Sequence, residues 1–245
     1  MNETFTFDGL NSATFGVYIS GDSVYNAPAR DVDMVTVPGR NGTIAIDNGR
    51  FENVEIVYPA FCWASDQAAF AGKIRAFRNA MKSRFGYHRL TDDYNPNEYR
   101  LGVYRDELSV NSSVYSSAGE FDVVFDCKPQ RWLTSGETPV AVANNGTITN
   151  PTGFASEPII KVTGDGTLYV GNYSLVIEAG ATNPIYIDCE LMEAYEINSA
   201  DEVINRNNLV TYQNGTFPRI EPGTVTITFS GNITAVEITP RWFVL

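Results

Sequence analysis

The chain has 245 residues, of which 43 % are hydrophobic, 12 % aromatic and 19 % charged. This composition is too apolar and too aromatic for an intrinsically disordered chain, and the length allows one or two domains. Gly, Pro, Tyr and Phe are abundant while charged residues are few. Together these features favour a mainly β protein with short strands and many turns.

The formal net charge is −12, and it is unevenly distributed. Residues 1–135 carry 13 basic and 17 acidic side chains, whereas residues 136–245 carry 4 basic and 12 acidic ones. Such an acidic protein lacks the cations that displace counterions from phosphates, which argues against nucleic-acid binding and against binding to anionic membranes. No apolar run approaches the roughly 20 residues of a membrane-spanning helix, so we expect no membrane insertion.

Cysteine is sparse and scattered, at Cys62, Cys127 and Cys189, with no Cys-x-x-Cys pair. This number and spacing predict neither a disulfide framework nor a zinc site. Free thiols are typical of proteins that fold in a reducing cytoplasm. The N-terminal stretch MNETFTFDGL also lacks the basic and then apolar pattern of a signal peptide.

Alternating apolar residues, separated by Gly, Pro and Asn, predict a series of short strands in the first half of the chain. The first strand covers residues 4–7 and ends at the Asp8-Gly9 turn. Further strands are predicted at 15–19, 34–37, 43–46 and 54–58.

A single helix is predicted between Ser65 and Phe85. Apolar residues recur there at spacings of four, three, four and four, the period of one helix face. They are Phe70, Ile74, Phe77, Met81 and Phe85. Ser65 or Asp66 is a suitable N-cap, and Gly86 can end the helix.

The polar side of this helix carries Lys73, Arg75, Arg78 and Lys82. One interpretation is a solvated face whose long side chains cover apolar surface. The other is a patch for a second copy or for another acidic partner, because residues 73–105 hold eight basic and three acidic residues in an acidic protein. We therefore treat these four residues as a candidate subunit interface and leave both interpretations open.

After the helix, residues 87–104 predict a long hairpin of two aromatic-rich strands around Asn95-Pro96-Asn97. Residues 120–126 predict an alternating strand. The next stretch, 133–157, is rich in Thr, Asn, Gly, Pro and Ser, so we place a domain boundary between residues 132 and 133. The chain then divides into 1–132 and 133–245.

Beyond the boundary, short strands at close intervals are typical of a β-sandwich or barrel. They are predicted at 159–163, 167–170, 174–177, 185–189, 224–229 and 235–245.

The sequence offers little catalytic chemistry. His88 is the only histidine, which excludes paired-histidine metal sites, and its place in the predicted hairpin favours a structural role. The glycine motifs of nucleophile elbows, phosphate loops and dinucleotide sites are absent. We therefore predict no enzyme, no catalytic residue, no cofactor and no metal.

Three carboxylate pairs remain as glycosidase candidates, because that reaction needs two acidic side chains at about 5–10 Å. They are Asp92 with Asp93, Glu190 with Glu193, and Asp201 with Glu202. Among 29 acidic residues such pairs arise by chance, so structural roles are favoured. The tryptophans are interpreted as core residues rather than ligand platforms; they are Trp63, Trp132 and Trp242.

Several short motifs follow one another along nearly the whole chain. The first half contains FTFDGLNSATFGVYI, the turn Pro38-Gly39-Arg40-Asn41-Gly42 and the closing segment KPQRW. The second half contains IYIDCELMEAY and the terminal Pro240-Arg241-Trp242. In this order the motifs resemble the distal tail protein (Dit) family of long-tailed phages that infect Gram-positive bacteria, and of their prophages. Residues 38–42 are similar to a turn in that family's ring-forming domain.

The resemblance implies a mainly β fold: an N-terminal β-sandwich with one α-helix and a long hairpin arm, then a galectin-like C-terminal β-sandwich. It implies a structural protein at the distal tail tip of the virion, made and assembled in the cytoplasm of the bacterial host. Six copies of residues 1–132 would form a ring through which DNA passes, and residues 133–245 would project outward. The implied partners are further copies, the tail tube protein, the tail-associated lysin or tail fibre hub, and receptor-binding proteins.

Two other functions stay open on the sequence alone. A lectin-like adhesion module would bind host-wall polysaccharide through Trp242 or nearby tyrosines, and a cell-wall glycosidase would use Glu190 and Glu193. A closed ring instead pairs two different surfaces of each subunit, and the basic helix face and the acidic remainder offer such surfaces. An acidic lumen would repel the passing DNA.

Overall fold

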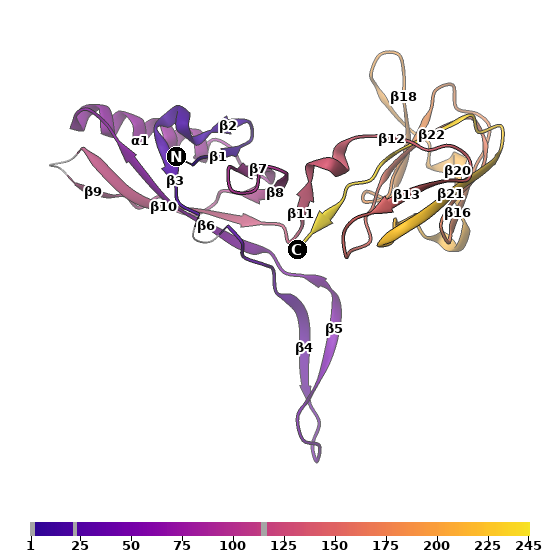
Figure 1. The fold of residues 1–245 in the computed structure, drawn as a ribbon, viewed down its shortest axis with the longest axis horizontal. Coiled ribbons are helices and arrows are strands. Elements are labelled where there is room, and N and C mark those ends of the chain that lie inside the picture. Colours follow the sequence, from indigo (N-terminus) through magenta and orange to yellow (C-terminus); the bar gives the residue numbers. More distant parts are fainter. Residues whose placement is uncertain (1–2, 22–23, 114–116) are drawn as a thin grey trace. The chain divides into compact units, whose positions relative to one another are not determined.

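The computed structural model describes residues 3–21, 24–113 and 117–245, and these residues form two compact units (Figure 1). The first unit covers Met1–Arg131 together with Leu245, and the second covers Trp132–Val244. Both are built mainly from β-strands, which confirms the predicted fold class. Each unit has its own hydrophobic core.

One long sheet and one α-helix make up the body of the first unit. Its elements are β1 (Phe5–Phe7), β2 (Leu10–Asn11), β3 (Val17–Ile19), β4 (Arg30–Thr36), β5 (Thr43–Phe51), β6 (Val54–Trp63), α1 (Gln67–Lys82), β7 (His88–Asp92), β8 (Glu98–Val103), β9 (Asn111–Ser113) and β10 (Ala118–Cys127). The sheet runs in the order β2-β1-β7-β8-β10-β6-β3, with β9 also paired to β10. An isolated antiparallel bridge links Glu3, which precedes β1, to Ile19 of β3, the last strand in this order.

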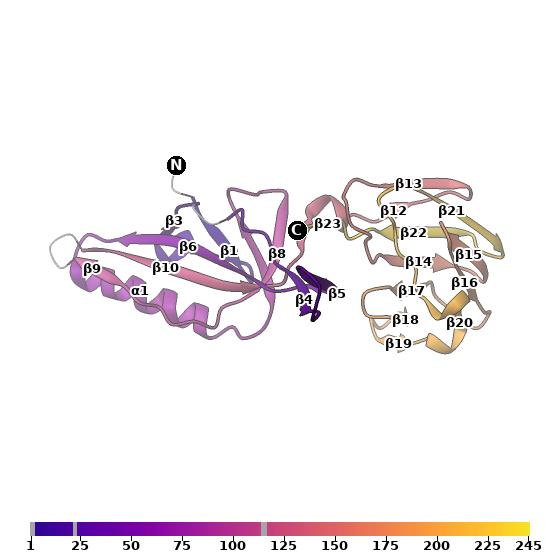
Figure 2. The ribbon, with the colours of Figure 1, turned by 90° about the horizontal axis from the view of Figure 1, so that it is seen from below.

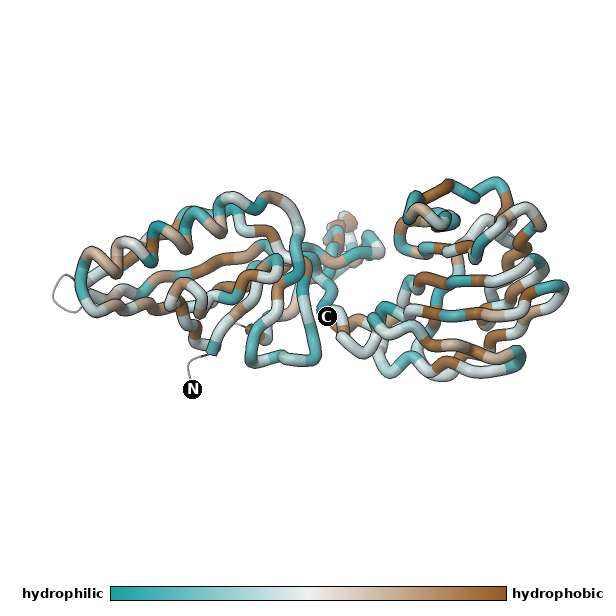
Figure 3. Tube along the Cα trace, turned by 90° about the horizontal axis from the view of Figure 1, so that it is seen from above, coloured by the Kyte–Doolittle hydropathy of each residue, from teal (hydrophilic) through white to brown (hydrophobic). Residues whose placement is uncertain are grey.

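Helix α1 packs its apolar stripe against the inner face of this sheet. Phe70, Phe77 and Met81 are buried in the core of the first unit. The ring of Phe77 lies 6.3 Å from that of Phe5 and 5.9 Å from that of Phe121. Figure 2 shows the helix running along β10, and Figure 3 shows the alternation of hydrophobic and hydrophilic residues along it.

The helix is shorter than the sequence predicted. Asp66 is the N-cap, as expected, and its carboxylate accepts from the Ala69 N–H at 2.8 Å. The helix ends at Lys82 with Ser83 as C-cap, before Gly86. The prediction that Phe85 continues the buried stripe is wrong, because this side chain lies beyond the last helical turn and is 90 % exposed.

The predicted hairpin at 87–104 exists, but it is part of the sheet. Strands β7 and β8 pair there, with His88 opposite Gly102. The long hairpin arm is formed instead by β4 and β5, where the sequence predicted two shorter strands. Among the described residues these two strands pair only with each other, and Figure 1 shows them as a long ribbon.

The second unit is a sandwich of two antiparallel sheets. After β11 (Arg131–Leu133), its strands are β12 (Val140–Ala141), β13 (Gly146–Asn150), β14 (Ile159–Thr163), β15 (Gly166–Val170), β16 (Tyr173–Ile177), β17 (Ile185–Asp188), β18 (Glu193–Ile197), β19 (Val203–Asn205), β20 (Val210–Tyr212), β21 (Gly223–Gly231), β22 (Ala235–Thr239) and β23 (Phe243–Val244). One sheet has the order β12-β22-β14-β17-β18-β19 and the other β13-β21-β15-β16-β20. Their inner faces share one core.

The last predicted strand, 235–245, is divided in two. Strand β22 ends at Thr239, and β23 begins at Phe243. Pro240 has no N–H to donate, and Arg241 adopts a left-handed conformation with φ +55°. The break turns the Arg241 guanidinium onto Asp188, with N–O distances of 2.8 and 2.9 Å.

Candidate interaction surfaces

The tip of the β4–β5 arm carries the turn that the sequence singled out. Residues 38–42 connect the two strands and are all exposed. The Arg40 N–H donates to the Val37 carbonyl at 3.2 Å. Gly39 and Gly42 have φ of +81° and +79°, a conformation that glycine adopts without a steric penalty.

The arm also exposes apolar side chains along its length, at 39–60 % of their surface. They are Val32, Met34, Val35, Ile44 and Ile46. A two-stranded ribbon is marginally stable by itself, and its free edges are open to further pairing. These exposed apolar side chains are typical of a segment that another protein chain covers in an assembly.

Polar contacts at the base of the arm hold its two strands together. Arg50 Nε lies 2.5 Å from an oxygen of Asp31, and the Asn48 amide donates to the other oxygen at 2.9 Å. These contacts, the Asn48 hydrogen bond first, lower the pKa of Asp31. Arg30 pairs with Asp47 across the strands. The charges at the base are thus paired within the arm.

The four basic residues predicted on one helix face divide into two kinds. Lys73 donates to the Trp63 carbonyl at 2.9 Å. Lys82 donates to the Asp106 carbonyl and lies over the Tyr104 ring. Arg75 and Arg78 are exposed and form no ion pair among the described residues. Lys73 and Lys82 therefore make contacts within their own chain, whereas Arg75 and Arg78 are available to a partner.

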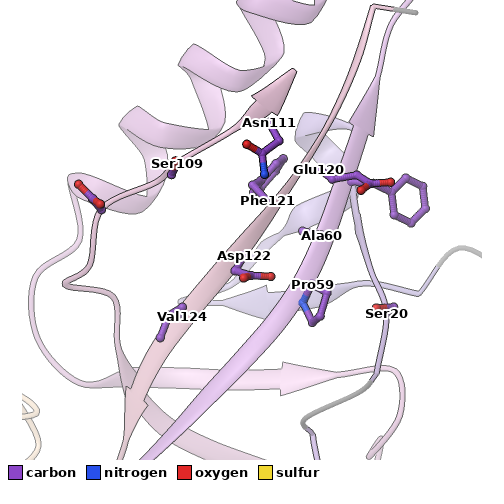
Figure 4. Close-up of a pocket in the computed structure, with 11 residues that line it drawn as sticks. Ser20, Pro59, Ala60, Ser109, Asn111, Glu120, Phe121, Asp122 and Val124 are labelled. Carbon is purple, nitrogen blue, oxygen red and sulfur yellow. The ribbon is translucent and has the colours of Figure 1, made fainter. Parts of the chain in front are cut away.

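A groove of about 580 Å³ lies on the outer face of β6 and β10, beneath the segment 107–111 (Figure 4). Its acidic lining consists of Glu107, Glu120 and Asp122, and its apolar lining includes Pro59, Phe61 and Val124. The register places Glu120 opposite Phe61 and Asp122 opposite Pro59. We call this surface the outer groove.

Sequence reasoning missed the outer groove, although the strand 120–126 was predicted. The sequence feature that could have indicated the groove is the outward face of this strand. Glu120, Asp122 and Val124 lie on that face and alternate with the buried Phe121 and Val123. The prediction that all tryptophans are core residues is wrong for Trp63, which is 45 % exposed and stacks on Phe61 and Tyr18. Trp132 and Trp242 are buried, as predicted.

Four of the six candidate catalytic carboxylates make contacts within the fold. Asp92 accepts from the Tyr58 hydroxyl at 2.9 Å, and Asp93 accepts from the Thr4 N–H at 2.7 Å. Glu190 lies 3.4 Å from Arg241, and Glu202 accepts from Asn198. No cluster of His, Cys, Asp and Glu suited to a metal ion occurs in the described part of the chain.

The histidine and the thiols are also held in structural positions. His88 Nδ1 lies 3.2 Å from an Asp8 oxygen, and its ring packs edge-on against Phe7. All three cysteines are free and buried. Burial raises the pKa of the Cys127 thiol to about 12 and also raises the pKa of Cys189, so the reactive thiolate is disfavoured at neutral pH.

The second unit has a buried charge pair next to the tryptophan that the lectin hypothesis would use. Asp188 is almost fully buried, and its two oxygens accept hydrogen bonds from the two terminal nitrogens of Arg241. The neighbouring Trp242 is 6 % exposed and belongs to the core. Its indole therefore offers no stacking surface to a sugar. Among the described residues no helix is long and apolar enough to cross a membrane.

A family model matches most of the first unit. Residues 11–127 match the family model described as the phage tail protein RIFT-related domain. Among curated proteins, none matches the chain.

Solved structures extend the similarity to the whole chain. The Dit protein (gp 19.1) of phage SPP1, described as a paradigm of the hub adsorption apparatus in phages that infect Gram-positive bacteria, matches with a TM-score of 0.78 at 12 % identity over 100 % of both chains. A chain of the phage P2 baseplate in its activated conformation with calcium matches with a TM-score of 0.52 at 10 % identity over 97 % of both chains. The resemblance that the sequence motifs indicated is confirmed.

Proposed function

We propose, from the phage tail protein RIFT-related domain in residues 11–127 and the Dit fold of the whole chain, that this protein is a structural hub of a phage tail tip. Copies of residues 1–132 form a homohexameric ring at the end of the tail tube. Residues 133–245 hold the tail fibre or receptor-binding apparatus. The observation that carries the proposal is the full-length match to SPP1 Dit.

The surfaces of the first unit suit such an assembly. A closed ring needs two different patches on each subunit. The exposed arm, the Arg75–Arg78 helix face and the acidic outer groove provide distinct patches on one unit. Four of the six candidate carboxylates make contacts within the fold and the three thiols are buried, which supports a structural role.

The role of the second unit in this proposal is docking. Its two sheets end in strands with free edges, and strand edges bind partners by adding a further strand. The partners would be receptor-binding proteins and the tail-associated lysin or fibre hub, while the tail tube protein would meet the ring. The buried Trp242 gives the lectin alternative no support.

The proposed path of DNA is the ring lumen. With a net charge of −12, the protein presents few cations to phosphates, so DNA would pass without being trapped. The protein would assemble in the host cytoplasm and remain in the virion at the distal tail tip.

Electron microscopy of purified protein, alone and with its tail tube protein, tests the proposal. We expect end-on views of six-fold rings, and gold-labelled antibody bound at one end of intact tails. A label distributed along the tail, or its absence from purified virions, would contradict the hub function.

A further inference from the structure

Two surfaces of the first unit have opposite charge and lie on opposite faces of the same strand. We infer that Arg75 and Arg78 of one copy dock onto the outer groove of the next copy, and that this contact joins neighbours in the ring. The inference rests on the proposed function, and it names the surfaces that meet.

The basic partner is one stripe of α1. Arg75 and Arg78 are three residues apart, so their side chains are neighbours on one helix face. Both are exposed, while Lys73 and Lys82 turn to backbone carbonyls of their own chain.

The acidic partner is the outer groove. Glu107, Glu120 and Asp122 are exposed and form no ion pair among the described residues. The half-buried Pro59, Phe61 and Val124 also line this groove, and Figure 4 shows Pro59 and Val124 near Asp122. Arginine pairs with carboxylates through two parallel hydrogen bonds and packs its flat guanidinium on apolar or aromatic surface, so the groove suits arginine side chains.

The position of the two surfaces favours a ring over a two-fold dimer. Phe121 faces inward and contacts Phe77 of α1, with ring centroids 5.9 Å apart. Its neighbours Glu120 and Asp122 point to the other side of β10. The helix and the groove of one copy therefore face in opposite directions and cannot both engage the same partner. Each copy binds one neighbour by its helix and another by its groove, which is a heterologous contact.

Charge reversal in the full-length chain tests this pairing, with the oligomer measured by sedimentation velocity and native mass spectrometry. A helix variant carries Arg75→Glu and Arg78→Glu, and a groove variant carries Glu120→Lys and Asp122→Lys. We expect each to weaken self-association by about tenfold or more, since like charges then meet. The chain with all four substitutions recovers the wild-type oligomer.

Mixing provides a second readout. The four-fold variant and wild type should form separate oligomers, because each mixed contact brings like charges together in either order. A matched control for the helix variant, Lys161→Glu with Arg219→Glu, changes the net charge by the same amount as that variant but on the second unit, and it should leave the oligomer unchanged. Circular dichroism checks that every variant is folded.

The outcomes separate this inference from the proposed function. Rings that persist in the helix and groove variants overturn the inference and leave the hub function in place. A four-fold variant that stays dissociated, while folded, overturns it as well. A wild-type chain that stays monomeric at its highest soluble concentration also contradicts docking between copies, whereas the hub function is judged by the label on intact tails.

Discussion

At the scale of single residues, the ion pair between Asp188 and Arg241 should contribute to the stability of the second unit, because its carboxylate is buried. The Asp188 side chain is 4 % exposed, and both its oxygens accept from Arg241. Replacing Arg241 by Met leaves the carboxylate buried without its partner, and we expect a loss of about 3 kcal/mol in the free energy of unfolding. Arg219→Met is the control, because its pair with Glu157 is exposed and should contribute about 1 kcal/mol or less. Urea titration measures both, and equal effects would contradict the argument.

The buried thiols predict how stability depends on pH. Burial raises the pKa of Cys127 from 9.0 to about 12 in the folded chain, so above pH 9 the unfolded chain loses a proton that the folded chain keeps. Stability is complete below that pH and falls as the pH rises toward 12. We expect the wild-type chain to lose more stability than Cys127→Ala between pH 8 and 10.5, measured by thermal unfolding. Parallel curves for the two chains would exclude this contribution of the thiol.

At the scale of elements, Phe77 and Phe85 differ in burial although the sequence predicted both on one apolar stripe of the helix, because α1 ends at Lys82. Phe77 is fully buried against Phe5 and Phe121, whereas Phe85 is 90 % exposed. Phe77→Ala should cost about 3–5 kcal/mol because it opens a cavity between helix and sheet. Phe85→Ala should change the free energy of unfolding by about 0.5 kcal/mol or less. Chemical denaturation of both variants checks the difference, and a large loss with Phe85→Ala would show that this residue packs in the folded monomer.

At the scale of the whole molecule, each unit has a separate core, so the two should unfold as separate cooperative steps. Differential scanning calorimetry should resolve two transitions. Phe77→Ala should lower the midpoint of one, and Arg241→Met that of the other. If either variant shifts both transitions equally, the units do not unfold independently.

Much of the fold could be predicted because the signals are local. Alternation along residues 120–126 and the spacing of Phe70, Ile74 and Phe77 depend only on near neighbours in the chain, and so does the Asp66 cap. The sequence pattern placed the long hairpin at 87–104 and predicted only short strands at 34–37 and 43–46, because the strands of the arm carry apolar residues on exposed positions. A sequence pattern does not tell such residues from those that a neighbouring layer covers.

The sequence by itself determined the mainly β class, the one α-helix of the described residues, the acidic charge and the resemblance to distal tail proteins. Only the tertiary structure decided which basic side chains are available, because Lys82 meets its carbonyl acceptor 24 residues further along the chain. The outer groove likewise exists only once β6 pairs with β10 and places Asp122 beside Pro59. Contacts between distant segments depend on strand register, and register is set by the packing of the whole core rather than by any short stretch of sequence.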